Sequence, residues 1–391
     1  METSSTFVRL PKLGFGIAIM MLLAAPTVLA NTADFSQTNL VSDMSGLAAS
    51  TDPNLKNPWG IAFSPTSPFW VSDQMTNVST LYQGDGTIVP LVVSVLGGPT
   101  GAVFTGGLGF SGSPAFAFDT LSGSIATWAG GSSATTVVST AGAVYTGLTI
   151  ANSGGANYLF AADSNGSIDV FDSNFNNVTH STFAGKFVDP SALAGFNPFN
   201  LQAIGSDIYV TYAQLGPGGT ALPGGYVDEF SSSGNFIMRL ATGGALYAPW
   251  GITLAPAGFG SFGGDILVGN FGNGEIDAYT PGGTFVGALD NSMGMPIINS
   301  NLWSLDFRTG AGFNPDALYF DAGIDNQKDG LFGSISPVAS PEPSSIVFLT
   351  SGLFGLLVCR KARRKCSSAG AAVLSPWFFG SRVAQPQSLD L

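Results

Sequence analysis

Short apolar segments alternate with turns of Gly, Pro, Ser and Asn along most of the chain. Within residues 167–171 (SIDVF) and 275–279 (EIDAY), apolar and polar residues alternate, which is the pattern of a half-buried β-strand. Asn-Gly pairs at 165–166 and 273–274 precede these segments and tolerate the positive φ angles of a tight hairpin turn. The pattern therefore predicts short antiparallel strands joined by hairpins.

The same order of elements recurs along the chain. Each copy predicts an apolar strand, a turn, a second strand ending in Asp or Asn, a tight turn and a third strand. The clearest copies span residues 57–86, 145–176 and 248–283, and weaker ones span 106–130, 200–240 and 301–335. Their anchor positions lie about 40 to 55 residues apart, which is the length of a four-stranded propeller blade. These anchors are Trp59, Leu108, Leu148, Leu201, Trp250 and Trp303.

Six copies predict an all-β fold, a six-bladed β-propeller over residues 31–336. The segment 38–43 precedes the first copy, and we expect it to form the outer strand of the last blade, which would close the ring and protect a sheet edge.

The pattern A-D-x-x-N-G-x-I-x-x-F of residues 162–171 resembles the repeats of NHL-type propellers. The segments 40–43 (LVSD), 51–65 (TDPNLKNPWGIAFSP) and 330–335 (GLFGSI) resemble a family of exported bacterial proteins without an assigned activity, often with PEP-CTERM tails. The resemblance implies a fold and a location, but no chemistry.

Residues 1–30 have the three parts of a signal peptide. Arg9 and Lys12 supply the positive region, residues 13–23 are apolar, and a small-x-small pattern ends at Ala30. Signal peptidase is then expected to cleave between Ala30 and Asn31. An uncleaved transmembrane helix is the alternative, although the apolar run is short for a span.

Residues 337–366 have the order of a sorting and anchoring signal. Pro341, Glu342 and Pro343 precede a short apolar run (344–359), which predicts a transmembrane helix, and a basic cluster (360–365) follows. This arrangement resembles the PEP-CTERM signal. The resemblance implies that an exosortase processes the protein and that the protein resides in the inner membrane before it is released. Ser340 stands where that family usually has Val. The alternative is an ordinary tail anchor.

The chain continues past the basic cluster, where such signals normally stop. Residues 367–391 are therefore an atypical tail, which we expect to be disordered.

Charge and cysteine content narrow the function classes. Residues 31–340 carry 22 Asp and Glu against 5 Lys and Arg, a net charge of −17, which disfavours nucleic acid as a partner. Both cysteines, Cys359 and Cys366, lie in the predicted anchor, so the ectodomain has no disulfide and no thiolate site. The single histidine, His180, falls in a predicted outer strand (177–182), and no nucleophile elbow accompanies it.

The starts of the blades carry the first candidate site, because propellers bind ligands where inner strands converge on the channel. Amide and indole groups there could bind a sugar or a peptide. Alternatively, the Trp side chains pack the blades and the Asn side chains cap turns. The residues are Asn57, Trp59, Asn200, Trp250, Asn301 and Trp303.

The ends of the second strands carry the second candidate site. Asp73, Asp163, Asn270 and Asp321 recur there and could offer oxygens to Ca²⁺ near the axis, as the resemblance to NHL-like and lactonase-type propellers implies. They equally fit Asx-turns. The acidic segment 321–330 lacks EF-hand spacing, and we expect a solvated loop.

The sequence thus favours an exported envelope or matrix propeller that binds a glycan or an envelope protein without catalysis. The alternative is a calcium-dependent hydrolase or lactonase acting at the central channel.

Overall fold

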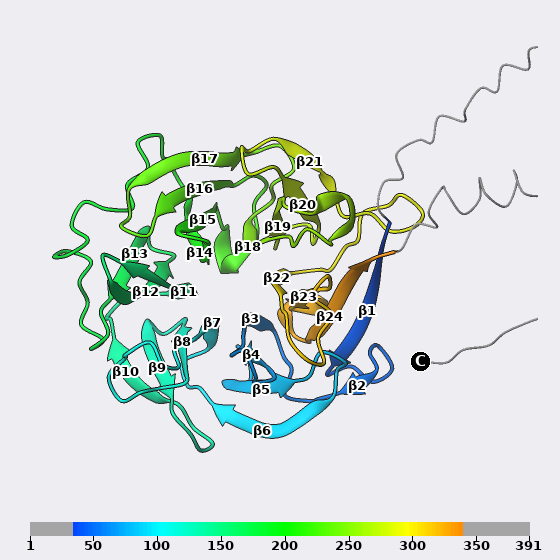
Figure 1. The fold of residues 1–391 in the computed structure, drawn as a ribbon, viewed down its shortest axis with the longest axis horizontal. Helices are drawn as coiled ribbons and strands as arrows, with labels where there is room; N and C mark the ends of the chain where they lie inside the picture. The colour runs from blue at the N-terminus through cyan, green and yellow to red at the C-terminus, as the bar shows by residue number, and fades with distance from the viewer. Residues whose placement is uncertain (1–33, 339–391) are drawn as a thin grey trace, which may run out of the picture. The chain divides into compact units, whose positions relative to one another are not determined.

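Six sheets surround a central axis in the computed structural model, which describes residues 34–338 (Figure 1). Each sheet is one blade, and its strands follow one another from the axis outward. The prediction of an all-β, six-bladed propeller is confirmed.

The blades differ in strand number, because four of them have four strands, the third has three and the sixth has five. Blade 1 contains β3 (Pro58–Ala62), β4 (Phe69–Asp73), β5 (Val78–Tyr82) and β6 (Ile88–Ser94). Blade 2 contains β7 (Pro99–Phe104), β8 (Phe116–Thr120), β9 (Ser124–Trp128) and β10 (Thr135–Ser139). Blade 3 contains β11 (Tyr145–Ser153), β12 (Ala156–Asp163) and β13 (Ser167–Phe171).

The second half of the ring follows the same order. Blade 4 contains β14 (Asn197–Ile204), β15 (Asp207–Ala213), β16 (Tyr226–Ser231) and β17 (Phe236–Thr242). Blade 5 contains β18 (Pro249–Leu254), β19 (Ile266–Asn270), β20 (Ile276–Tyr279) and β21 (Phe285–Ala288). Blade 6 contains β22 (Leu302–Phe307), β23 (Leu318–Ala322), β24 (Leu331–Pro337) and β1 (Phe35–Ser42), with β2 (Ser50–Thr51) parallel to β1. The remaining elements are single turns: α1 (Ile324–Gln327) and 3₁₀ turns at Pro217–Gly219 and Gly260–Phe262.

The N-terminal strand closes the ring. β1 pairs antiparallel with β24, from Phe35 opposite Pro337 to Ser42 opposite Leu331, and the two lie side by side in Figure 1. Beyond the strands, the Val338 N–H donates to the Asp34 carbonyl at 2.7 Å. The prediction that segment 38–43 supplies the outer strand of the last blade is confirmed.

Glycines let the inner strands of neighbouring blades touch. Every inner strand has a register shift near its start. Four glycines lie at these shifts, and a Cβ at each would come within 2.1 to 2.4 Å of an atom on the next inner strand: Gly60, Gly101, Gly147 and Gly251. Blades 4 and 6 carry Asn200 and Ser304 instead, whose side chains donate to the carbonyls of Trp250 (2.9 Å) and Trp59 (2.8 Å) on the next blade.

The core lies between the blades as a series of apolar clusters. Between blades 1 and 2, for example, the Trp70 ring stacks on Phe116 with centroids 4.3 Å apart. Since the described residues contain no disulfide-forming cysteine, this apolar burial is what holds the blades together.

The predicted second blade began too late. Leu108, taken as its anchor, lies in the connection between β7 and β8 and is 36% exposed. The inner strand is β7, which precedes the predicted copy (106–130). Thr100-Gly101 stands there in place of the Trp-Gly pair of blades 1 and 5, whereas the predicted copy began at the glycine-rich segment 106–110 of the β7–β8 connection.

His180 is not on a strand, so the predicted outer strand at 177–182 is wrong. The segment forms one bridge, Asn177 with Phe171, and then turns away. Phe183 and Phe187 pack on Phe160, with ring centroids 5.5 Å apart in both pairs. These apolar contacts hold the segment against blade 3 in place of a fourth strand.

The acidic segment 321–330 is solvated only in its middle. Asp321, Ala322, Gly323 and Gly330 are buried, whereas Asp325, Asn326 and Lys328 are exposed. The buried residues at one end are the last two of β23 and Gly323 after it, and the buried residue at the other end is Gly330, directly before β24.

The predicted signal peptide, the sorting motif with its transmembrane helix, and the tail lie outside the described residues. Within residues 34–338, no helix has the length and apolar character needed to cross a membrane.

Candidate binding site in the central channel

Aromatic side chains fill the channel at the end where the inner strands begin. Trp59 stacks on Trp303 at 3.6 Å between centroids, and Phe271 stacks on the same indole at 4.3 Å. Trp250 meets Trp59 and Trp303 edge-on, at 6.3 and 5.6 Å. We call Trp59, Phe199, Trp250, Phe271 and Trp303 the aromatic plug; all five are buried.

The structure brings together the predicted blade-start residues, but as bonded and packed groups. The Trp303 indole donates to Asn57 Oδ1 at 3.1 Å, and the Trp250 indole donates to the Thr146 carbonyl at 2.9 Å. Asn57 and Asn200 are 3% and 6% exposed. Asn301 has a left-handed φ of 53°, and its carbonyl accepts from the Gly323 N–H at 2.9 Å. These contacts fit the alternative interpretation, in which the Trp side chains pack the blades and the Asn side chains cap turns.

The predicted calcium residues each bond within or beside their own blade. Asp73 Oδ2 accepts from the Thr80 N–H and hydroxyl (3.1 and 2.7 Å), and Asp163 Oδ1 accepts from the Val144 N–H (3.0 Å). Asn270 Oδ1 accepts from the Tyr247 N–H (2.9 Å). Asp321 Oδ1 accepts from the Ser304 N–H (2.7 Å).

These four residues do not share one register position. Asp73, Asp163 and Asn270 pair with the first residue of their inner strands, whereas Asp321 lies one residue earlier, opposite the register shift. Successive strand residues point to opposite faces, so Asp321 instead matches Asp119 of blade 2. Among residues 34–338, no three His, Cys, Asp or Glu side chains form a group that could hold a metal ion. The calcium site stays a prediction.

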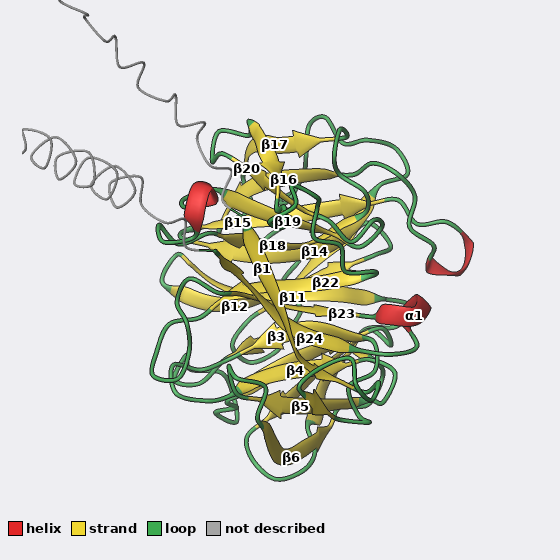
Figure 2. Ribbon diagram, turned by 90° about the vertical axis from the view of Figure 1, so that its right-hand side faces the viewer, coloured by secondary structure: helices red, strands yellow, loops and turns green. Residues whose placement is uncertain are grey.

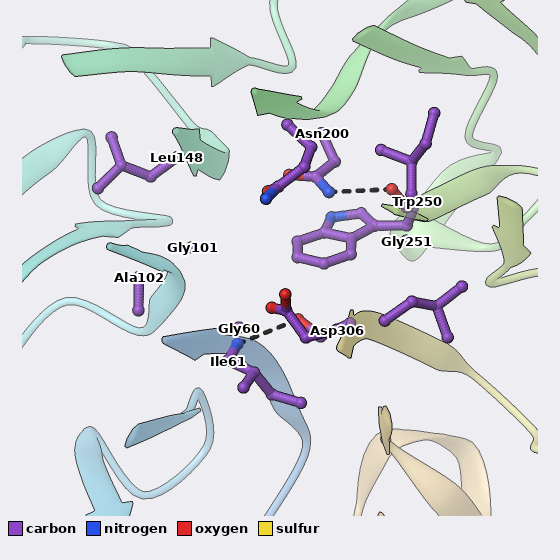
Figure 3. A pocket seen from close by; sticks show the side chains of 13 residues that line it. Gly60, Ile61, Gly101, Ala102, Leu148, Asn200, Trp250, Gly251 and Asp306 are labelled. Carbon is purple, nitrogen blue, oxygen red and sulfur yellow. Dashed lines mark hydrogen bonds between the residues drawn. The ribbon is translucent and has the colours of Figure 1, made fainter. Parts of the chain in front are cut away.

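The channel is hollow on the other side of the plug. Two adjoining cavities of about 20 and 230 Å³ share Ile61, Ala102, Gln202 and Asp306 in their walls. All six inner strands contribute to the smaller cavity, and Trp250 of the plug lines it (Figure 3). We call the larger cavity, at the carboxyl ends of the inner strands, the channel mouth.

One ring of residues gives the mouth a polar side and an apolar side. Each inner strand has one residue at the level of the aromatic plug: Trp59, Thr100, Thr146, Phe199, Trp250 and Trp303. Three positions after this residue, blades 1 and 2 carry apolar side chains and blades 3 to 6 carry polar ones. The ring is Ala62, Val103, Thr149, Gln202, Thr253 and Asp306, and all of these except Thr253 line the mouth. A ligand in the mouth would therefore find hydrogen-bonding groups on one side only.

Asp306 is the ionisable group of this ring. Figure 3 shows its carboxyl group pointing into the pocket, toward the Trp250 ring. Burial among the inner strands, and then the negative charge of Asp321, raise its pKa to about 8. The Asp306 and Gln202 side chains make no hydrogen bond to another described residue, whereas Thr149 Oγ1 accepts from the Ala203 N–H at 3.0 Å. Near neutral pH, Asp306 can thus donate a proton to a ligand or accept one from it.

Neither Asp306 nor Gln202 was singled out from the sequence. The available signal was a polar residue inside a predicted apolar strand, as in LWSLDF (302–307) and NLQAI (200–204). Asp306 and Gln202 are half-buried, and a polar side chain that loses water without gaining a partner costs free energy, so such positions are candidates for a ligand contact.

Comparison with known proteins gives relatives but no activity. No model of a known protein family matches the chain. One uncharacterized protein of Acanthamoeba polyphaga mimivirus is 31% identical over 340 residues, which is 76% of this chain and 84% of the viral protein. A second one from the same virus is 31% identical over 329 residues, 76% of this chain and 78% of its own. The chain belongs to the family of these two proteins.

The relatives correct one expectation, because they are viral, whereas the sequence motifs indicated a bacterial family. With no matching family model, the NHL and PEP-CTERM resemblances rest on the sequence motifs alone.

Solved structures support the fold only. A protein of unknown function from Bacteroides thetaiotaomicron aligns with a TM-score of 0.52 and 12% identity, covering 78% of this chain and 77% of that one. A streptogramin B lyase structure aligns over 78% of this chain and 98% of its own at 12% identity, but its TM-score of 0.43 is too low to support an inference.

Proposed function

We propose that this protein is an exported binding module of the cell envelope or extracellular matrix, which takes a group of a glycan or of an envelope protein into the channel mouth. The observation that supports a binding role is a cavity, the channel mouth, that is lined by two polar side chains available to a ligand. The channel is blocked by the aromatic plug and hollow beyond it, and Asp306 and Gln202 line the hollow without hydrogen bonds to other described residues.

The size of the mouth limits what enters. Pockets for drug-sized ligands usually measure about 300 to 1,000 Å³, and the mouth measures about 230 Å³. It therefore accommodates a single sugar ring or a single side chain, which makes the end of a chain or a projecting group a better fit than an internal segment. Hydroxyl groups match Asp306 and Gln202, because a hydroxyl can donate to one of these side chains and accept from the other.

A binding role needs fewer groups than catalysis does. Glycoside hydrolysis, for example, generally uses two carboxyl groups flanking the bond. Among the described residues that line the mouth, Asp306 is the one carboxylic acid. We therefore favour a module that binds without turnover.

A glycan array with the full-length chain, purified in mild detergent, tests the binding role. Asp306→Asn and Gln202→Ala should each weaken binding about tenfold, because each removes one hydrogen-bonding partner from the mouth. Asp85→Asn is the matched control, since Asp85 lies on the exposed β5–β6 turn. If Asp306→Asn and Asp85→Asn bind the same glycans equally well, the mouth is not the site.

The location rests on the sequence patterns at the two ends. We propose that signal peptidase cleaves after Ala30 and that an exosortase-type enzyme processes the chain at Pro341–Pro343, with residence in the inner membrane before release. The net charge of −17 over residues 31–340 is compatible with an extracellular environment rich in divalent cations.

Amino-terminal sequencing and cell fractionation test this route. The mature chain should begin at Asn31, and Pro343→Ala should keep the protein in the membrane fraction. Pro376→Ala, in the tail, is the matched control and should not change the distribution. A mature protein that still begins at Met1 would contradict export through a cleaved signal.

A further inference from the structure

We propose that the end of the ring opposite the channel mouth carries a second binding site, which takes an extended acidic peptide. The site is a depression of about 570 Å³ lined by blades 1 and 6 and by the Gly97-Gly98 turn that leads into blade 2. Its wall contains five side-chain amides: Asn57, Gln74, Asn77, Asn326 and Gln327. We call it the amide depression; the turn α1, which contributes two of these amides, marks this face in Figure 2.

The orientation of the side-chain amides follows from neighbouring N–H groups, which can donate a hydrogen bond but cannot accept one. The Trp303 indole N–H can only donate, and it lies 3.1 Å from Asn57 Oδ1. Asn57 therefore presents its NH₂ group to Gln74 Oε1, at 2.9 Å. With its oxygen occupied in this way, Gln74 directs its own NH₂ group elsewhere, and that group bonds to no other described residue.

Asn77 and Gln327 follow the same logic. Asn77 Oδ1 accepts from the Gly97 and Gly98 N–H groups at 3.1 and 2.8 Å. Gln327 Oε1 lies 3.5 Å from the Asn57 NH₂ group. In both side chains the oxygen accepts from protein donors, and the NH₂ group bonds to no other residue of the described range 34–338. The amide depression thus offers N–H donors, and its complement is a ligand rich in oxygen acceptors.

The backbone beside the depression is strained in a way that supports a binding role. Asp325, Asn326 and Gln327 have consecutive left-handed φ values of 50°, 57° and 66°. Such conformations are unfavourable outside glycine, although Asn and Asp adopt them more readily than other residues, and they cluster at sites that hold ligands. Backbone bonds from Gln327 N to Gly323 O (2.8 Å) and from Asp329 N to Ile324 O (3.1 Å) hold the turn in place.

The surroundings favour a peptide over a glycan. Met75 and Leu96 expose 51% and 71% of their surface beside the depression and could contact apolar side chains of a peptide. The residues lining the depression include no aromatic ring on which a sugar could stack. Lys328 lines it too. Its ammonium lies 3.9 Å from Asp325 Oδ2 in an exposed pair, and because its side chain is 67% exposed it can also reach a carboxylate on the ligand. An extended peptide supplies carbonyl acceptors along its backbone, and acidic side chains supply the carboxylate.

The test uses fluorescent pools of random octapeptides in which one position is fixed as Asp, Asn or Lys. Full-length protein should bind the Asp pool most tightly. Gln74→Glu preserves the oxygen that accepts from Asn57 but replaces the free NH₂ group with oxygen, and should weaken binding of the Asp pool about tenfold. Gln83→Glu makes the same chemical change on the exposed β5–β6 turn and should have no effect.

Lys328→Ala provides a second readout that does not depend on the buried network. It should weaken the Asp pool but leave the Asn pool unchanged, because only the former loses an ionic contact. Equal binding of the three pools, or equal binding by the wild type and both the Gln74→Glu and Lys328→Ala variants, would overturn the proposal. Binding of a neutral glycan that Gln74→Glu abolishes would also overturn it, by assigning the depression to sugars. Asp306→Asn should leave peptide binding intact, so a failure of the channel-mouth proposal can be distinguished from a failure of this one.

Discussion

Replacing Gly60 with alanine should destabilise the propeller, because the inner strands of blades 1 and 2 meet at this residue. A Cβ on Gly60 would lie 2.2 Å from the Thr100 carbonyl oxygen, whereas real Cβ atoms essentially never come closer than 3.0 Å. The obstructing atom belongs to the backbone, so relief requires that two blades separate by about 0.8 Å. Overpacking of this kind costs about 1 to 3 kcal/mol of unfolding free energy.

The matched control is Gly282→Ala. Its φ is not in the left-handed region, and the nearest atom to a new Cβ is Thr280 Oγ1 at 3.9 Å. There the substitution only restricts the unfolded chain, so it should be neutral or should stabilise the protein by about 0.4 to 1 kcal/mol.

Urea unfolding followed by tryptophan fluorescence measures the difference, since three of the six Trp residues lie in the plug beside the inner strands. For a propeller of about 300 residues, the entropy of unfolding is roughly 0.6 kcal/mol/K, so the Gly60→Ala loss corresponds to about 2 to 5 °C in thermal midpoint. If both alanine variants shift the midpoint alike, close approach of the inner strands is not what requires glycine.

Three further perturbations test other parts of the ring. Burial raises the pKa of Asp119 and of Asp321 to about 7, so the stability that comes from protonation is complete below about pH 4 and is lost as the pH rises toward 7. Asp119→Asn should therefore reduce the fall of the thermal midpoint between these pH values. An unchanged slope would show that the raised pKa of Asp119 does not contribute to it. Trp303→Ala removes the centre of the aromatic plug and should cost about 3 to 5 kcal/mol in denaturant unfolding. Arg239→Ala leaves the buried Asp228 carboxylate without its 2.8 Å partner and should cost about 3 kcal/mol or more at pH 8, and a loss below 1 kcal/mol would show that this ion pair is dispensable.

The sequence allowed the blades to be recognised where an aromatic–small pair opens the inner strand. Trp59-Gly60, Trp250-Gly251 and Trp303-Ser304 all mark correct strands. Blade 2 opens on Thr100-Gly101 and was displaced, although blade 3 opens on the similar pair Thr146-Gly147 and was placed correctly. The missing outer strand of blade 3 depends on contacts of Phe183 that no local pattern reveals.

The candidate site was harder to predict than the fold. The blade-start tryptophans lie together in the aromatic plug, but their packing on one another depends on three blades converging. Asp306 became a candidate only when all six inner strands were in place, because its burial and its raised pKa come from neighbours distant in the chain. The second-strand acids looked equivalent in sequence, and a one-residue difference in pairing register separates Asp321 from the others.

The pairing of β1 with β24 has a consequence for how the chain matures. The hydroxyl of Ser42 donates to the carbonyl of Gly330, 288 residues away, so the first strand synthesised finds its partner only when nearly the whole domain has been made. Contacts of such long range slow folding. Until they form, β1 and the outer edge of β24 remain unpaired and can associate with the corresponding edges of another chain. We therefore expect that crowding during biosynthesis produces dimers in which two chains exchange β1 at its contact with β24.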